Sequence, residues 1–391
     1  MTTLEVARTT ADRAPAGRRR VLLAPVTITP TKPLTPSHLK GLFWTDVVQR
    51  ATEPLADVTH RSSHTVFDPC EQTAGFWEYL DRTVGDVDYS CLSEDEIGRL
   101  YVRYRTNGER APFSACVPYL DAIERHGWVH PASTRLLELR ADQYRGLGLR
   151  DPGGLTERQP PALTLDEAID RLHEADLCLD LRANGGPVFV DATRDGLPLR
   201  QIVAADGRPN YLACALRDLL PLVTEHDETV LLYDRGLEPD YLLLQRVLAR
   251  TGGRPVHRVP LGRVPVDGTI ASARHGGWQG TSARDLLERF APHHDPAALK
   301  LGMRLYFVGV LGPGDHDSFR VDLLDRNLTR ARKLLDTAED VGWDRVLDLL
   351  SGLRGVRGET REHVDAYRLT TGLLGRHGPP PSRELLEAVF A

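Results

Sequence analysis

A strand that leads directly into a helix near the N-terminus constrains the fold of this chain more than any other feature. Residues 21–28 (VLLAPVTI) form a continuous apolar, β-branched run, which is typical of a parallel strand covered on both faces. A Pro- and Thr-rich loop follows over residues 29–37. A helix is expected from about His38, because apolar residues then recur every three or four positions. This unit predicts an α/β fold.

The alternation of strands and helices returns after a mixed region, residues 55–160, and a Gly/Pro-rich linker. A largely parallel sheet is therefore expected. The strands are expected at 187–190, 202–204, 230–233 and 256–259, with helices at 119–125, 163–175 and 239–250. From Ser282 the pattern is helical to the end, with helices expected at 283–290, 297–308, 321–337, 343–352, 359–373 and 382–390.

These elements predict a Rossmann-like parallel sheet that is split by an insertion and followed by a small helical domain. The expected boundaries are a mobile lead-in at 1–18, the first half of the core at 19–54, the insertion at 55–162, the second half at 163–280 and the helical domain at 281–391.

Composition excludes several classes of protein. The net charge of −6 gives no global basic field for DNA, although a local basic groove stays open. The five cysteines are scattered and none form a CxxC pair, so a reducing cytoplasm is expected and a structural zinc is not. His293 and His294 are adjacent on an expected loop, which favours no metal site. The apolar run that ends at Pro25 is too short for a signal peptide or a membrane span.

The first chemical motif lies between the first strand and its helix. Residues 32–40 (KPLTPSHLK) resemble the KPLHVGHLR stretch of arginyl-tRNA synthetases, in which HVGH is the "HIGH" signature of class I aminoacyl-tRNA synthetases. His38 keeps the second His, Thr35 replaces the first, and Ser37 replaces the Gly. Such a loop delivers ATP phosphates to a helix N-terminus. Read without the resemblance, His38 is an ordinary histidine at a helix start.

The resemblance implies a role for each residue of this motif. His38 and Thr35 would donate hydrogen bonds to the α-phosphate as charge develops. Lys32 would reach the phosphates from the opposite side, as in arginyl enzymes that lack a lysine in their signature loop. Without the resemblance, Lys32 is a solvated loop lysine. Pro30 and Ser37 are implied in nucleotide binding, and Ser37 adds bulk where the base packs.

The second motif follows the last expected core strand. Residues 262–276 (GRVPVDGTIASARHG) look like the stretch around the class I "KMSKS" loop, although Asp-Gly within it is also simply a good turn pair. The two lysine positions hold Ile270 and Ala273. Ser272 and Arg274 are therefore implied as ligands of the departing pyrophosphate, and His275 as a nucleotide ligand.

A third, weaker resemblance concerns the substrate. Residues 206–216 (DGRPNYLACAL) are similar to the DGTPTYLTRDIA segment of arginyl enzymes, where Tyr and Asp bind arginine. Tyr211 is kept, but Cys214 and Ala215 stand at the Arg and Asp positions. Since a guanidinium needs a carboxylate partner, the substrate is expected not to be arginine, or to be bound differently. Tyr211 reads equally well as a core tyrosine.

Three further residues complete the implied site. Thr27, on the first strand, is implied in substrate binding. Gly236 and Glu238 follow a core strand, where the family contacts ribose. Without the resemblance, Glu238 is an acidic residue at a helix start, where the helix dipole favours negative charge.

The resemblance covers most of the chain outside residues 55–160 and implies a HUP-type Rossmann core that uses ATP and Mg²⁺. The first expectation is a cytoplasmic, AMP-forming ligase that adenylates an amino-acid-like carboxylate and transfers it to a small-molecule amine or hydroxyl. Few residues follow 276, which disfavours an anticodon-binding domain and so disfavours tRNA as a partner. The alternatives are a minimal, arginyl-like synthetase that charges tRNA, and a non-catalytic paralog that binds a nucleotide or amino acid. No DNA or membrane partner is expected.

Overall fold

The computed structural model describes residues 17–26, 28–61, 70–106, 111–151, 161–269, 276–356, 359–375 and 380–391. The strands are β1 (Arg20–Pro25), β2 (Asp57–His60), β3 (Cys178–Asp180), β4 (Val188–Val190), β5 (Arg200–Val203), β6 (Glu228–Asp234), β7 (Val256–Leu261), β8 (Arg354–Val356) and β9 (Glu359–Val364). The helices are α1 (Pro36–Thr52), α2 (Glu71–Thr83), α3 (Glu94–Thr106), α4 (Phe113–His126), α5 (Pro131–Leu147), α6 (Leu165–Glu174), α7 (Tyr211–Val223), α8 (Glu238–Gly252), α9 (Ala283–Phe290), α10 (Pro296–Arg304), α11 (Val321–Asp336), α12 (Trp343–Gly352), α13 (Ala366–Leu373) and α14 (Arg383–Leu385).

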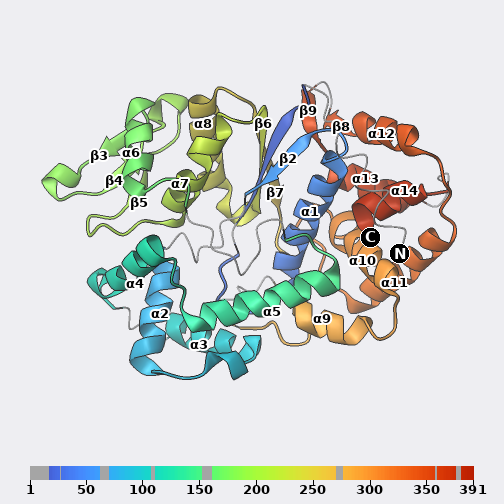
Figure 1. Ribbon diagram of the computed structural model, residues 1–391, viewed down its shortest axis with the longest axis horizontal. Coiled ribbons are helices and arrows are strands. Elements are labelled where there is room, and N and C mark those ends of the chain that lie inside the picture. The colour runs from blue at the N-terminus through green and yellow to red at the C-terminus, as the bar shows by residue number, and fades with distance from the viewer. Residues whose placement is uncertain are drawn as a thin grey trace.

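A four-stranded parallel sheet forms the centre of the molecule, with the strand order β2-β1-β6-β7 (Figure 1). The apolar run of β1 explains its central place. Val21 and Leu23 pack into the core shared with α1 and the C-terminal helices, while Leu22 and Ala24 pack into the core shared with α7 and α8. The predicted α/β fold with a split parallel sheet is confirmed.

The strand order reverses between β1 and β6, because the chain proceeds from β1 outward to β2 and later from β6 outward to β7. Ligands of open α/β sheets bind at the carboxyl ends of the strands beside such a reversal. At this edge the segments after β1, β6 and β7 come together, and α1 and α8 begin there.

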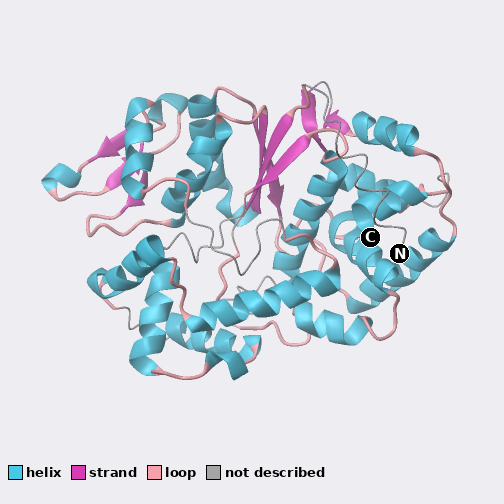
Figure 2. Cartoon of the chain, in the orientation of Figure 1, coloured by secondary structure: helices cyan, strands magenta, loops and turns pink. Residues whose placement is uncertain are grey.

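The insertion between β2 and β6 has two parts, which Figure 2 shows as a helical group and a small sheet. Helices α2 to α5 enclose an aromatic core of their own. Strands β3, β4 and β5 form an antiparallel sheet. The expectation that residues 187–190 and 202–204 belong to the parallel sheet was therefore wrong. The segments that join β3, β4 and β5, residues 181–187 and 191–199, are shorter than the crossover that parallel strands need, so each strand pairs antiparallel with the next.

The expected helix over 359–373 was wrong in its first half. Residues 359–364 form β9, which pairs with β8, and the helix α13 begins only at Ala366. The backbone amides of Glu362 and His363 donate to the Glu228 carboxylate, at 2.7 and 3.1 Å. Glu228 lies far away in the sequence, and it holds this segment extended.

Among the helices in the described ranges, none combines the length and apolar character that a membrane crossing requires.

Candidate functional site

The start of α1 fixes the orientation of His38. Thr35 is the N-cap, Pro36 begins the helix, and Thr35 and His38 form a reciprocal capping box. The Thr35 amide donates to His38 Nδ1 at 3.0 Å. Because Nδ1 accepts this hydrogen bond, the neutral ring carries its proton on Nε2. The half-buried His38 can therefore donate from Nε2 to an anion at the helix N-terminus.

Three cationic side chains surround His38. Burial lowers the pKa of His38 well below its ordinary value, and the charges of Lys32, Arg140 and Arg263 lower it further. Lys32 is 8% exposed, and its Nζ lies 5.2 Å from the centre of the Tyr101 ring. The cluster combines a neutral donor with a positive field, which suits a polyanionic ligand.

Arg140 is a member of this cluster that the sequence interpretation missed. It is buried on α5 and donates to the carbonyls of Ile28, Thr29 and Lys32 at 2.7, 2.8 and 3.2 Å. The loop after β1 is therefore held in place by the insertion. The only signal in the sequence was an arginine among the buried leucines of α5, such as Leu136, and long arginines commonly keep their charged end in water.

The segment after β7 meets the same motif. The Val264 amide donates to Ser37 Oγ at 2.9 Å. Further along, the Ala283 amide donates to the Leu34 carbonyl at 2.9 Å. The structure thus brings the start of the second sequence motif, and the segment that follows the motif, to the first motif. Thr27, Ser272, Arg274 and His275 themselves lie outside the described residues.

The insertion completes this junction at Gly98. A Cβ atom at Gly98 would lie 2.8 Å from the Trp278 ring and 2.9 Å from Pro33, so both residues pack against the bare glycine backbone. The Trp278 indole also donates to the Asp95 carboxylate at 2.5 Å. Trp278 therefore anchors the downstream end of the second motif beside the first one.

Tyr211, expected to bind the substrate, and Glu238, expected to bind the ribose, lie in a second group around the start of α8. The Tyr211 hydroxyl donates to the Asp240 carboxylate, which also pairs with Arg200 at 2.8 Å. Glu238 accepts from the Tyr233 hydroxyl and pairs with Arg258. Of the other expected substrate residues, Cys214 is buried and Ala215 is partly buried. The carbonyl of Pro30, which was expected at the nucleotide, accepts from Ser133 Oγ at 3.3 Å.

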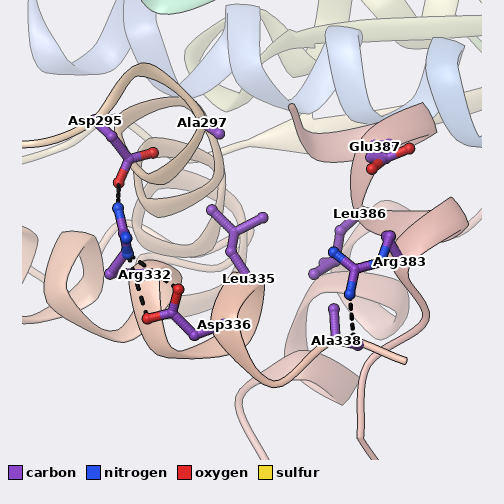
Figure 3. A pocket seen from close by; sticks show the side chains of 9 residues that line it. All are labelled: Asp295, Ala297, Arg332, Leu335, Asp336, Ala338, Arg383, Leu386 and Glu387. Carbon is purple, nitrogen blue, oxygen red and sulfur yellow. Dashed lines mark hydrogen bonds and ion pairs between the residues drawn. The ribbon is translucent and has the colours of Figure 1, made fainter. Parts of the chain in front are cut away.

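A pocket of about 210 Å³ lies in the C-terminal helical region (Figure 3). Arg332 crosses it between Asp295 and Asp336, at 2.7 and 3.1 Å. Arg383 is held by Asp340 at 3.0 Å and by the Ala338 carbonyl at 2.9 Å. Since both arginines already have acceptors, this pocket does not compete with the cluster around His38 as an anion site.

Comparisons with known proteins place the fold. No protein-family model matches the chain, and no curated protein matches its sequence. The arginyl-tRNA synthetase of Thermus thermophilus superposes with a TM-score of 0.55 and 16% identity, over 95% of this chain and 72% of that one. An arginyl-tRNA synthetase of Plasmodium falciparum gives 0.49 and 11%, over 87% and 60%. A glutamate-tRNA synthetase of Elizabethkingia anophelis gives 0.33 and 14%, over 91% and 80%. The likeness to the Thermus enzyme carries the fold assignment.

Proposed function

Because the chain has the fold of a class I aminoacyl-tRNA synthetase, we propose that it is an AMP-forming ligase. It adenylates an amino-acid-like carboxylate with ATP and transfers the acyl group to a small-molecule amine or hydroxyl. One observation carries the proposal. Val264, within the motif at 262–276, and Ala283, seven residues beyond that motif, donate hydrogen bonds to Ser37 and Leu34 of the motif at 32–40, at the sheet edge where ligands of such folds bind.

In the first step, a carboxylate oxygen of the substrate attacks the α-phosphorus of ATP. An O–P bond forms, the bond from the α-phosphorus to the bridging oxygen breaks, and pyrophosphate leaves with the electron pair. His38 Nε2–H donates to a non-bridging oxygen of the α-phosphate, and the Thr35 hydroxyl supports the same side. Lys32, Ser272 and Arg274 hold the pyrophosphate. Positioning and charge stabilisation supply the catalysis.

In the second step, the acceptor attacks the carbonyl carbon of the acyl-adenylate. A C–N or C–O bond forms, the bond from the carbonyl carbon to the AMP oxygen breaks, and AMP leaves with that electron pair. The proton of the amine or hydroxyl passes to solvent. The acyl group ends on the acceptor, with AMP and pyrophosphate as the other products.

Magnesium fits this site only as an ion carried by the nucleotide. Among the described residues, no group of three His, Cys, Asp or Glu side chains is arranged to hold a metal. Asp234, beside the cluster, already accepts from Arg263 and from the Gly236 amide. Mg²⁺ commonly keeps its waters and binds through phosphate oxygens, so we route no step through a protein-held ion.

A tRNA acceptor is the second candidate. The superposition on the Thermus arginyl-tRNA synthetase extends over 95% of this chain, which favours it. The small-molecule acceptor stands first because Cys214 and Ala215 occupy the positions where arginyl enzymes bind arginine, which disfavours the arginyl-like synthetase that is the tRNA-charging candidate. In addition, Asp240 is already engaged by Tyr211 and Arg200.

The test is ATP–pyrophosphate exchange over a panel of amino acids, with and without tRNA, in the wild-type protein and in His38→Ala. Exchange without tRNA, lost in His38→Ala, supports the small-molecule ligase. Exchange that needs tRNA replaces it with the second candidate. ATP binding without exchange for any acid would overturn both and leave a non-catalytic nucleotide-binding paralog.

A further inference from the structure

Arg263 differs from the other cations around His38 in what its side chain can still bind. The Arg140 guanidinium donates to three loop carbonyls, and Lys32 is buried above Tyr101. The Arg263 side chain, in contrast, is 42% exposed. The next residue, Val264, donates to Ser37 Oγ at 2.9 Å, so Arg263 lies beside the motif that carries His38. It is thus the member of the cluster that solvent and a ligand can reach.

Asp234 orients this guanidinium. Arg263 Nε donates to Asp234 Oδ2 at 2.6 Å, and Asp234 Oδ1 accepts from the Gly236 amide at 2.8 Å. The carboxylate is therefore fixed at the end of β6 and takes only the inner edge of the guanidinium. Among the described residues, Nη1 and Nη2 of Arg263 donate to no protein acceptor.

The glycine at position 236 lets the backbone approach this pair closely. A Cβ atom there would lie 3.2 Å from Asp234 Oδ1 and 3.4 Å from Arg263 Nη2. The contact with Asp234 is tighter than most Cβ contacts, so a larger side chain would shift the carboxylate that orients Arg263. The pair lies where β6 ends, beside the reversal of strand order, which is where a ligand of this fold binds.

The backbone on each side of Arg263 is also fixed. The Gly262 amide donates to the Pro313 carbonyl at 2.8 Å, and the Val264 amide donates to Ser37 Oγ at 2.9 Å. A guanidinium held by its backbone and by one carboxylate is preorganised, so little side-chain entropy is lost when it binds.

We propose that Arg263 is a catalytic residue of the proposed reaction, and that its two free Nη groups bind phosphate oxygens of ATP. Asp234 is the positioning residue that aims it. The fork of a guanidinium matches two oxygens of one phosphate group, so Arg263 holds the pyrophosphate as its bond to the α-phosphorus breaks. The catalytic role of Arg263 rests on the proposed function, whereas the binding of phosphate by Arg263 can be tested without turnover.

The test measures the dissociation constants of ATP and of inorganic pyrophosphate by calorimetry, with thermal unfolding as a check on folding. The variants are Arg263→Gln, Arg263→Lys and Asp234→Asn. The matched control is Arg182→Gln. Arg182 also pairs with an aspartate, Asp180, and its side chain is 40% exposed, but it lies in the turn between β3 and β4 of the small antiparallel sheet.

We expect Arg263→Gln to weaken the binding of both ligands at least tenfold. We expect Arg263→Lys to recover part of this loss, and Asp234→Asn to lose less than Arg263→Gln because the charge remains. Arg182→Gln should bind like the wild type. Unchanged binding in Arg263→Gln, or equal loss in Arg182→Gln, would overturn the assignment. A wild type that binds neither ligand overturns this assignment together with the proposed function, whereas binding without exchange for any acid overturns the proposed function and the catalytic role but leaves the binding of phosphate by Arg263.

Discussion

At the start of α1, a backbone donor decides which nitrogen of His38 holds the proton. The Thr35 amide occupies Nδ1, and the low pKa of the ring keeps it neutral, so Nε2 remains a hydrogen-bond donor across the neutral pH range. The histidine therefore carries no charge itself, although the side chains around it are positively charged. The local positive charge comes from Lys32, Arg140 and Arg263.

The first prediction concerns His38 itself. Replacement of His38 by Ala removes one donor to the α-phosphate, and we expect about a 10²-fold loss in the rate of acid activation, with ATP affinity changed much less. ATP–pyrophosphate exchange and calorimetry measure the two quantities. His316→Ala is the control, because this histidine is 92% exposed. An unchanged exchange rate in His38→Ala would remove His38 from the mechanism.

At the scale of elements, the interaction between α1 and the segment after β7 depends on Ser37. Arginyl enzymes have a glycine at this position, and from the resemblance we predicted that a serine would crowd the nucleotide. In the structure the serine hydroxyl accepts a hydrogen bond from the Val264 amide at 2.9 Å. On the other side of that segment, the Phe319 amide donates to the Pro265 carbonyl at 2.7 Å. The helix and the C-terminal region therefore hold the segment between them.

The second prediction follows from this contact. In Ser37→Ala the Val264 amide loses its acceptor, which costs about 0.5–1.5 kcal/mol for a typical hydrogen bond. We expect amide hydrogen exchange at Val264 to speed up by as much as about tenfold, while exchange in the core strand β1 is unchanged. Ser114→Ala, at an exposed serine on α4, is the control. Equal protection of Val264 in both variants would show that Ser37 does not hold this segment.

The sequence predicted those elements whose own residues determine them. The strand β1 was recognisable because its apolar run packs on both faces, and α9 because Ser282 and Asp285 form a capping box that the structure confirms. β9 was not recognisable, because what keeps it extended is Glu228, which is distant in the sequence. In the same way, the motif around His38 was visible, but the approach of Arg140 and Arg263 to it depends on packing between distant segments.

At the scale of the molecule, a buried ion pair joins three parts of the chain. Arg304 of α10 is fully buried and donates to the Asp46 carboxylate of α1 at 2.6 and 2.9 Å. The same carboxylate accepts from the Arg150 amide at 3.0 Å, at the end of the helical insertion. Burial alone would raise the pKa of Asp46, but the charges of Arg304 and Arg50 outweigh burial and lower it.

The third prediction tests this joint. Asp46→Ala leaves the Arg304 charge buried without its partner, and we expect a loss of about 3–5 kcal/mol in the free energy of unfolding. The double variant Asp46→Leu with Arg304→Met removes both charges and should recover much of that loss. Asp57→Asn is the control, since its pair with Arg18 is largely exposed and costs less than about 1 kcal/mol. Urea unfolding measures the free energy of unfolding of all three variants. An equal loss in Asp46→Ala and Asp57→Asn would show that the buried ion pair does not hold the three parts of the chain together.

A second buried carboxylate attaches the hairpin β8–β9 to the opposite end of the sheet from the candidate site. Glu228, at the start of β6, accepts from His363 Nδ1 at 2.6 Å and faces His257 Nε2 at 3.4 Å. Burial alone would raise the pKa of Glu228, but its interactions with His257 and His363 outweigh burial and lower the pKa to about 2. The folded state therefore releases a proton from this group more readily than the unfolded chain.

The fourth prediction is the acid sensitivity that follows from this difference. A carboxyl group with a depressed pKa stabilises the fold above its unfolded pKa, near 4.3. This stabilisation is lost as the pH falls toward about 2. At about 1.4 kcal/mol per pH unit, the contribution is at most about 3 kcal/mol. Glu228→Gln should be less stable than the wild type at pH 7, and the difference should shrink steadily below pH 4.5.

Urea unfolding at a series of pH values gives this difference directly, because carboxyl groups common to both proteins cancel. Glu288→Gln is the control, since the Glu288 side chain is 61% exposed, and its difference from the wild type should be small at every pH. A Glu228→Gln deficit that stays constant from pH 7 to pH 3 would mean that the carboxylate acts through packing and not through its charge. The hairpin would then be held by its backbone hydrogen bonds alone, and acid would loosen it no more than the rest of the sheet.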